Sequence, residues 1–138
     1  MIEYQATTKM IDDNLFETTL NDQKIVLDTG SKPKQSQSPV EVLLSAIGSC
    51  SSIDVAEIIK KKRKTVGALE VKINAKRRTE PLPKLITEFN LHFILTSHDA
   101  EEKELKQAVE LSVDKYCTVA GMVRSVAKVN YSWEIKRP

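Results

Sequence analysis

Hydrophobic and polar residues alternate with a period of two in the first part of the chain, a pattern that predicts β-strands. The alternating positions are Ile2, Tyr4 and Ala6, then Phe16, Thr18 and Leu20, and finally Ile25 and Leu27. The stretches Asp12-Asp13-Asn14 and Asn21-Asp22-Gln23 separate them with residues that favour turns. We therefore predict a three-stranded meander, followed at residues 29–38 by an exposed polar loop in which we expect mobility.

The apolar segment after this loop predicts a buried helix. Ser38, Pro39 and Glu41 fit the N-cap, N1 and N3 positions of a capping box, in which the serine and the glutamate satisfy each other's backbone N–H groups. Apolar residues then occupy nearly every side of the helix until the basic run at residues 60–64. Basic residues complement the dipole at a helix C-terminus, and we prefer this interpretation to a nucleic-acid-binding patch.

The second half of the chain has the patterns of a hairpin, a helix and a closing strand. Alternation at residues 69–75 and 89–95, on either side of a break at residues 80–83, predicts a second hairpin with one buried face. Asp99 or Ser97 then fits the cap of an amphipathic helix whose stripe runs from Leu105 to Tyr116, with Cys117 at its edge. A last alternation at residues 129–135 predicts a closing strand.

The resulting order is βββ-α-ββ-α-β, an α+β fold in which two long helices pack against antiparallel sheet. No repeat or linker divides the chain, so we expect residues 1–138 to form a single domain. The first helix is too apolar for one half-polar sheet of so small a protein to cover. We therefore predict a homodimer.

Composition and charge narrow the partners and the compartment. Hydrophobic residues make up 41% and charged residues 29% of the chain, and 21 basic against 19 acidic residues leave a net charge of only +2. This net positive charge is too small to indicate that the protein binds nucleic acid. The N-terminus lacks the apolar core of a secretory signal, and the stretch Val40–Ile47 is far shorter than the ~20 residues that span a bilayer. We expect a cytoplasmic protein with no membrane span and with reduced cysteines.

Few side chains are left to carry chemistry. The four glycines are isolated, so no phosphate-binding loop is predicted, and His92 and His98 lack a metal-ligand spacing to the cysteines. A grouping of Cys50, His92 and Asp99 has no local signature. Cys50 and Cys117 would form a redox pair if their helices crossed closely, whereas composition alone favours two buried thiols that act as small hydrophobic residues.

Two segments resemble a known family. The segment SPVEVLLSAIGSCSSIDV at residues 38–55 resembles the P-x-E-x-L-L-x-A-x-x-x-C-x-x-x-D pattern of the OsmC family, which includes the organic hydroperoxide resistance proteins. LSVDKYCTV at residues 111–119 resembles the second cysteine segment of that family. The resemblance covers nearly the whole chain and is greatest to the branch of small OsmC-like proteins.

The resemblance implies an OsmC-like fold in an intertwined homodimer with active sites at the subunit interface. It implies a thiol peroxidase that reduces organic hydroperoxides in oxidative stress defence, with Cys50 as the peroxidatic and Cys117 as the resolving cysteine. Cys50 would become a sulfenic acid and condense with Cys117 to a disulfide. An external dithiol, lipoyl-type in this family, would reduce the disulfide, and neither a cofactor nor a metal is expected.

A peroxidatic thiol also needs activation, because a free thiol of pKa about 8.5 is mostly protonated at pH 7. The family's peroxidases use an arginine from the N-terminal half, balanced by a glutamate near the start of the first helix. Glu41 matches this glutamate, but no arginine precedes Arg63, which makes Lys32 and Lys34 the candidate activating cations. Lysine lacks the bidentate fork of arginine.

Two carboxylates near the first cysteine have more than one interpretation. Glu41 stands nine positions before Cys50, on the opposite side of a straight helix, so direct contact requires a break, and capping alone explains its presence. Asp54, one turn after Cys50, would raise the thiol pKa if it were unpaired. The missing arginine also motivates a second function, an OsmC-fold protein that binds an apolar or acyl ligand and has vestigial or regulatory cysteines.

Overall fold

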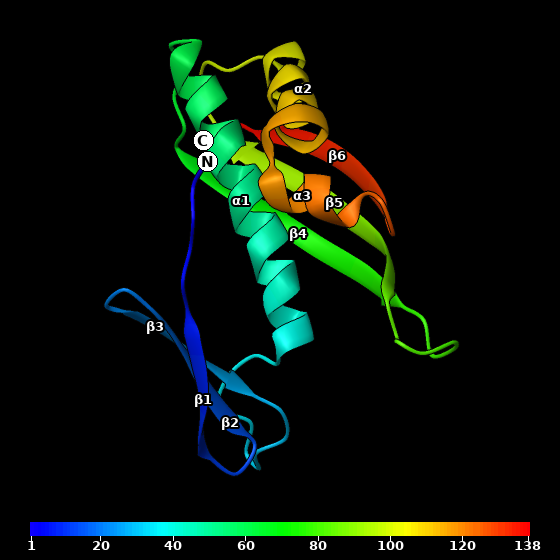
Figure 1. The fold of residues 1–138 in the computed structure, drawn as a ribbon. Helices are drawn as coiled ribbons and strands as arrows, with labels where there is room; N and C mark the ends of the chain where they lie inside the picture. The colour runs from blue at the N-terminus through cyan, green and yellow to red at the C-terminus, as the bar shows by residue number, and fades with distance from the viewer. The chain divides into compact units, whose positions relative to one another are not determined.

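The strands and helices of the computed structural model, which describes residues 1–138, follow the predicted order βββ-α-ββ-α-β (Figure 1). Two short additions, a π-helical turn and a third helix, lie between the second long helical segment and the last strand. The chain forms two compact units, Met1–Leu43 and Leu44–Pro138, and the boundary between them falls within helix α1 (Pro39–Lys61). That the two units act as one domain stays a prediction.

The first unit contains the predicted meander. Strands β1 (Thr7–Asp12), β2 (Leu15–Leu20) and β3 (Gln23–Asp28) form an antiparallel sheet in the order β1-β2-β3. Asn14 and Asn21 occupy the two turns with φ values of 63° and 54°, a left-handed conformation that asparagine tolerates.

The start of the first strand was predicted wrongly. Ile2, Tyr4 and Ala6 alternate, but the strand begins at Thr7. The turn after Asp12 fixes the register and pairs Thr7 with Thr19, next to the end of β2 at Leu20. Leu20 is the last residue of β2, so the positions before Ala6 have no strand opposite them, and alternation alone does not extend the sheet.

The second unit holds a mixed sheet. Strands β4 (Ala68–Arg77) and β5 (Ile86–Thr96) form the predicted antiparallel hairpin, and β6 (Lys128–Lys136) is the predicted closing strand. The prediction of purely antiparallel sheet was wrong, because β6 pairs with β5 in parallel. The helical crossover between β5 and β6 returns the chain to the end of the sheet from which β5 starts, and this imposes the parallel direction.

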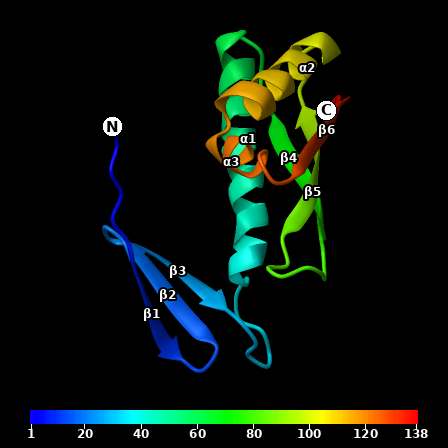
Figure 2. The same ribbon diagram turned by 45° about the vertical axis from the view of Figure 1, so that its right-hand side comes forward.

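Helices cover one face of this sheet. Figures 1 and 2 show the later part of α1, helix α2 (Glu102–Leu111) and helix α3 (Thr118–Val123) on the same side of β4 to β6. Strand β5 lies in the middle of the sheet and contributes more buried apolar side chains than any other element. The largest side chains that are fully buried there are Phe89, Leu91, Phe93, Leu95, Ile47, Ile59 and Leu105.

The second long helix is shorter than predicted. Its N-cap is Glu101, whose N–H donates to the Glu104 side chain at 2.9 Å, so the prediction of Asp99 or Ser97 as the cap was wrong. Asp99 instead accepts the Thr65 N–H at 2.8 Å. The helix ends at Leu111 and continues as a single π-helical turn, η1 (Ser112–Tyr116). Tyr116 consequently leaves the predicted apolar stripe and is 53% exposed.

Helix α1 begins as predicted. Glu41 accepts the Ser38 N–H at 2.9 Å, and Ser38 Oγ accepts the Glu41 N–H at 3.3 Å, which confirms the capping box. Its buried residues follow one stripe rather than every side, and Ile53 is 58% exposed. By length and composition alone α1 could cross a membrane, which the sequence analysis had excluded, but the core helix of a soluble protein meets the same criterion.

Gly48 lets α1 approach β4 closely. A Cβ atom at this position would lie 2.7 Å from Ile73 Cδ1. We predict that Gly48→Ala lowers the free energy of unfolding by about 1 kcal/mol, because an overpacking cost of about 1–3 kcal/mol exceeds the helix-propensity gain of about 1 kcal/mol. Urea denaturation measures this difference.

The matched background for this test is Ile73→Val, which removes the Cδ1 atom and leaves the strand otherwise unchanged. In that background Gly48→Ala should be less destabilising than in the wild-type protein, since the 2.7 Å contact is gone and Ile73 Cγ1 at 3.3 Å is the tightest contact left. A stabilising Gly48→Ala substitution in the wild-type protein would contradict the steric explanation.

Candidate functional site

The structure brings the two cysteines together. Cys50 lies on α1, and Cys117 is the N-cap of α3. Both thiols are free, and Cys50 lies near enough to Cys117 to raise the pKa of Cys117. The two cysteines are therefore neighbours within the second unit.

The π-helical turn places Cys117. The Cys117 N–H donates to the Ser112 carbonyl at 2.7 Å, across five residues instead of the four of an α-helix. Cys117 then leaves helical geometry, with φ −69° and ψ 109°, and its Sγ accepts the Ala120 N–H at 3.4 Å. Single π turns are rare and often occur at functional sites.

The two thiols differ in accessibility. Cys117 is 3% exposed, and burial, together with the neighbouring Cys50, raises its pKa to about 11, although the Ala120 N–H acts in the opposite direction. Cys117 is therefore protonated at neutral pH. Cys50 is only partly buried, so it is the thiol that reagents and substrates reach more easily.

A serine that the sequence analysis did not single out links the two cysteine-bearing segments. Ser112 Oγ lies 2.8 Å from the Ser51 carbonyl and 3.3 Å from Asp54 Oδ2, both on α1. Ser112 is fully buried, and a serine inside an apolar helix stripe was its only signal in the sequence. Burial raises the pKa of Asp54, the hydrogen bond to Ser112 opposes this effect, and the Glu57 carboxylate adds to it.

A cavity of about 500 Å³ opens beside Asp54. Its lining combines charged groups with apolar and aromatic side chains, namely Asp54, Glu57, Ile58, Lys61, Leu111 and Tyr116. Because Asp54 follows Cys50 by one helical turn and Tyr116 precedes Cys117, the cavity borders both cysteine-bearing segments.

Glu41 and Lys34 form an ion pair in the first unit. Lys34 Nζ donates to Glu41 Oε1, and this bond, with the Ser38 N–H, lowers the pKa of Glu41 to about 2. Lys32 is exposed in the same loop. Helix α1 is continuous across Glu41 and Cys50, so the break that direct contact between them requires is absent.

The loop that carries both lysines folds around a buried carboxylate. Asp28 accepts the N–H groups of Gln35 and Ser31 at 2.7 Å and of Gly30 at 2.9 Å. These bonds lower the pKa of Asp28 to about 2, so the residue is charged at any physiological pH. No role was predicted for Asp28, because turn signals do not reveal which loop N–H groups a carboxylate will bind.

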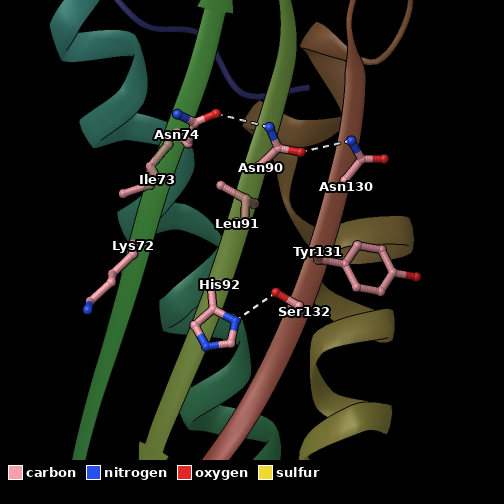
Figure 3. Close-up of a pocket in the computed structure, with 9 residues that line it drawn as sticks. All are labelled: Lys72, Ile73, Asn74, Asn90, Leu91, His92, Asn130, Tyr131 and Ser132. Atoms are coloured by element: carbon pink, nitrogen blue, oxygen red, sulfur yellow. Dashed lines mark hydrogen bonds between the residues drawn. The ribbon is translucent and has the colours of Figure 1, made fainter.

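The outer face of the second sheet carries a polar network. Figure 3 shows Asn74, Asn90 and Asn130 side by side on β4, β5 and β6, joined by amide hydrogen bonds of 3.1 and 2.9 Å. A hollow of about 430 Å³ lies over this face. The amides bond to one another across the strands, so they stabilise the register of the sheet.

His92 belongs to the same polar face. Its Nδ1 lies 2.6 Å from Ser132 Oγ (Figure 3). Its Nε2 lies 2.9 Å from Glu134 Oε1. Asp99 bonds instead to Thr65 and Ser97, so the structure does not form the Cys50, His92 and Asp99 grouping. No three His, Cys, Asp or Glu side chains are grouped as a metal site would require.

The difference between the thiols predicts selective alkylation. Iodoacetamide at pH 7.5 should modify Cys50 of the reduced protein at least about tenfold faster than Cys117, because Cys117 is buried and its thiolate accumulates only as the pH approaches about 11. Peptide mapping over time measures both rates, and the denatured protein serves as the control. Faster modification of Cys117 than of Cys50 in the folded protein would contradict this geometry.

Comparisons with known proteins agree with the fold. The family model described as OsmC-like protein matches residues 31–132. Protein YhfA of Escherichia coli strain K12 is 38% identical over 132 residues, which cover 95% of this chain and 97% of YhfA. A hypothetical protein from Aquifex aeolicus VF5, 33% identical, superposes with a TM-score of 0.90 and covers 100% of this chain and 99% of that one.

The same fold occurs in the organic hydroperoxide resistance protein OsmC from Legionella pneumophila, at 11% identity and a TM-score of 0.72, covering 97% of this chain and 98% of that one. The family model spans both cysteine segments on which the resemblance was based. The resemblance is confirmed, and the chain belongs to the OsmC-like family.

Proposed function

We propose that this protein is a thiol-dependent peroxidase that reduces organic hydroperoxides in oxidative stress defence. The observation that carries the proposal is the proximity of a partly exposed thiol, Cys50, to a buried, protonated thiol, Cys117. The shared fold with the organic hydroperoxide resistance protein from Legionella pneumophila supports the choice of substrate. Cys50 is the peroxidatic and Cys117 the resolving cysteine.

In the first step the Cys50 thiolate attacks one oxygen of the hydroperoxide. The O–O bond breaks, the sulfur loses two electrons, and the other oxygen leaves as an alkoxide that takes up a proton to become the alcohol. Cys50 is then a sulfenic acid. The partial exposure of Cys50 suits it to this encounter.

In the second step Cys117 attacks the sulfur of the sulfenic acid. A disulfide forms, and the hydroxyl of the sulfenic acid leaves as water with the proton of the Cys117 thiol. Burial of Cys117 keeps external peroxide from this thiol until its neighbour is oxidised. An external dithiol of the lipoyl type then reduces the disulfide, with no cofactor or metal in the cycle.

The cation for Cys50 comes, in this proposal, from a second copy of the chain in a cytoplasmic homodimer. The charged pair of Lys34 and Glu41 takes the place of the family's arginine and glutamate at the partner's Cys50, with Lys32 as the neighbouring cation. Apolar side chains left exposed on the helices support a second copy, among them Ile53 at 58% and Met122 at 74% exposure. A charge-paired lysine is held in place, as an activating residue must be.

A second candidate function rests on the cavity beside Asp54. Its volume of about 500 Å³ and the side chains of Ile58 and Leu111 suit an apolar or acyl ligand. In that case the protein binds the ligand without efficient peroxidase turnover.

The peroxidase proposal predicts that the two cysteine variants lose activity at different steps of the reaction. With cumene hydroperoxide and dihydrolipoamide, Cys50→Ser should lower peroxide consumption by at least about 100-fold, because the nucleophile is lost. Cys117→Ser should react once per chain and then stop as a sulfenic or over-oxidised Cys50. Peroxide consumption and intact mass measure the two outcomes.

Ser49→Ala provides the matched control on the same helix. Ser49 is exposed next to Cys50 and bonds only to carbonyls of its own helix, so its loss should leave the rate unchanged. Consumption by Cys50→Ser at the wild-type rate would remove Cys50 from the mechanism. If the wild-type protein consumes no hydroperoxide and native mass spectrometry finds a bound apolar molecule, the second function replaces the first.

A further inference from the structure

Asp54 follows Cys50 by one turn of the continuous helix α1. Residues four apart on a helix lie about 5–6 Å from each other at Cβ, and helical side chains lean toward the N-terminus. Asp54 therefore leans back over the turn that carries Cys50. The peroxidase reaction described above assigns Asp54 no role.

The surroundings of Asp54 suit both of its protonation states. A serine hydroxyl has one proton to donate and lone pairs to accept, and Ser112 Oγ contacts both the Ser51 carbonyl and Asp54 Oδ2. When Ser112 donates to the Ser51 carbonyl, which can only accept, a neutral Asp54 can donate to Ser112 Oγ. When Asp54 is charged, the hydroxyl can rotate and donate to it.

The titratable groups around Asp54 come from two elements. Glu57 and Lys61 lie on α1 and line the same cavity, and Tyr116 borders it from η1. Burial and Glu57 raise the pKa of Asp54, which brings the carboxyl group closer to the range in which thiols titrate. Proton transfer between a carboxyl group and a thiol becomes easier as their pKa values converge.

We propose that Asp54 shuttles a single proton during the oxidation of Cys50: its carboxylate takes the proton of the Cys50 thiol and returns it to the departing alkoxide. This inference rests on the proposed peroxidase function. The thiol and the hydroperoxide become a sulfenic acid and an alcohol, the sulfur supplies the two electrons that break the O–O bond, and Asp54 ends as the carboxylate that it was at the start.

The shuttle also gives a carboxylate beside the thiol a favourable effect on the reaction. An ionised Asp54 that only repelled the thiolate would oppose activation. A carboxylate that removes the thiol proton and keeps it within reach of the alkoxide serves both halves of the step. The cavity beside Asp54 gives the departing alcohol a place next to the proton donor.

The test measures the rate of Cys50 oxidation against pH in a Cys117→Ser background, which isolates the first step. The protein reacts with cumene hydroperoxide, dimedone traps the sulfenic acid, and intact mass gives the rate constant. The shuttle needs one proton shared between Asp54 and Cys50, so the pH profile should be bell-shaped, with an acid limb set by Asp54. Asp54→Asn should react about 100-fold more slowly at pH 7, and its rate should only rise with pH.

Two further variants in the same background separate proton transfer from structural support. Asp54→Glu keeps a carboxyl group and should recover part of the rate and the bell shape. Glu57→Gln removes a charge one turn away and should keep a rate close to that of the background protein. Its acid limb should move to lower pH, because Glu57 raises the pKa of Asp54.

The outcomes separate the shuttle from the peroxidase function. If Asp54→Asn reacts as fast as the background protein or faster at pH 7, Asp54 is not a shuttle and the peroxidase function stands. If the background protein is not oxidised at all, both proposals fail. Should Asp54→Asn not fold, as judged by circular dichroism, an acid limb that does not move in Glu57→Gln would overturn the shuttle.

Discussion

The hydrogen bond from the Cys117 N–H to the Ser112 carbonyl is the contact on which the candidate site depends. It closes the π-helical turn and allows Cys117 to end one helical segment and cap the next. The same serine holds α1 through its hydroxyl, at the Ser51 carbonyl and at Asp54. One buried residue thus fixes the segment of the second thiol against the helix of the first.

This arrangement gives two identical functional groups different chemistry. Cys50 sits on a continuous helix and is partly exposed, whereas Cys117 is buried and its pKa is raised to about 11. A disulfide-forming cycle needs this order, because the first thiol must meet the substrate and the second must wait for the sulfenic acid. Asp54 lies on the helix of Cys50, and Ser112 lies on the π-helical turn before Cys117. In the proposed shuttle, these two residues are the carboxyl group that transfers the proton and the hydroxyl that bonds to it.

Local interactions were predictable from the sequence, and longer-range ones were not. The capping box of Ser38 and Glu41 depends on residues three apart, so its pattern was enough. Alternation located β6 but could not reveal that it pairs in parallel, since a strand alternates in either direction. The π turn could not be predicted, because the apolar stripe of the helix continues past Leu111 without a change in the hydrophobic pattern. Residue chemistry left the two cysteines as a possible redox pair and the family resemblance implied their roles, whereas Ser112 became a candidate only when the structure placed it against α1.

The most direct test of the account is the mass of the reduced wild-type protein after one equivalent of cumene hydroperoxide. If Cys50 and Cys117 form one redox unit, the mass should fall by two hydrogens and neither thiol should remain available for alkylation. Two thiols that stay free under these conditions would contradict the account, since their proximity would then have no part in peroxide chemistry.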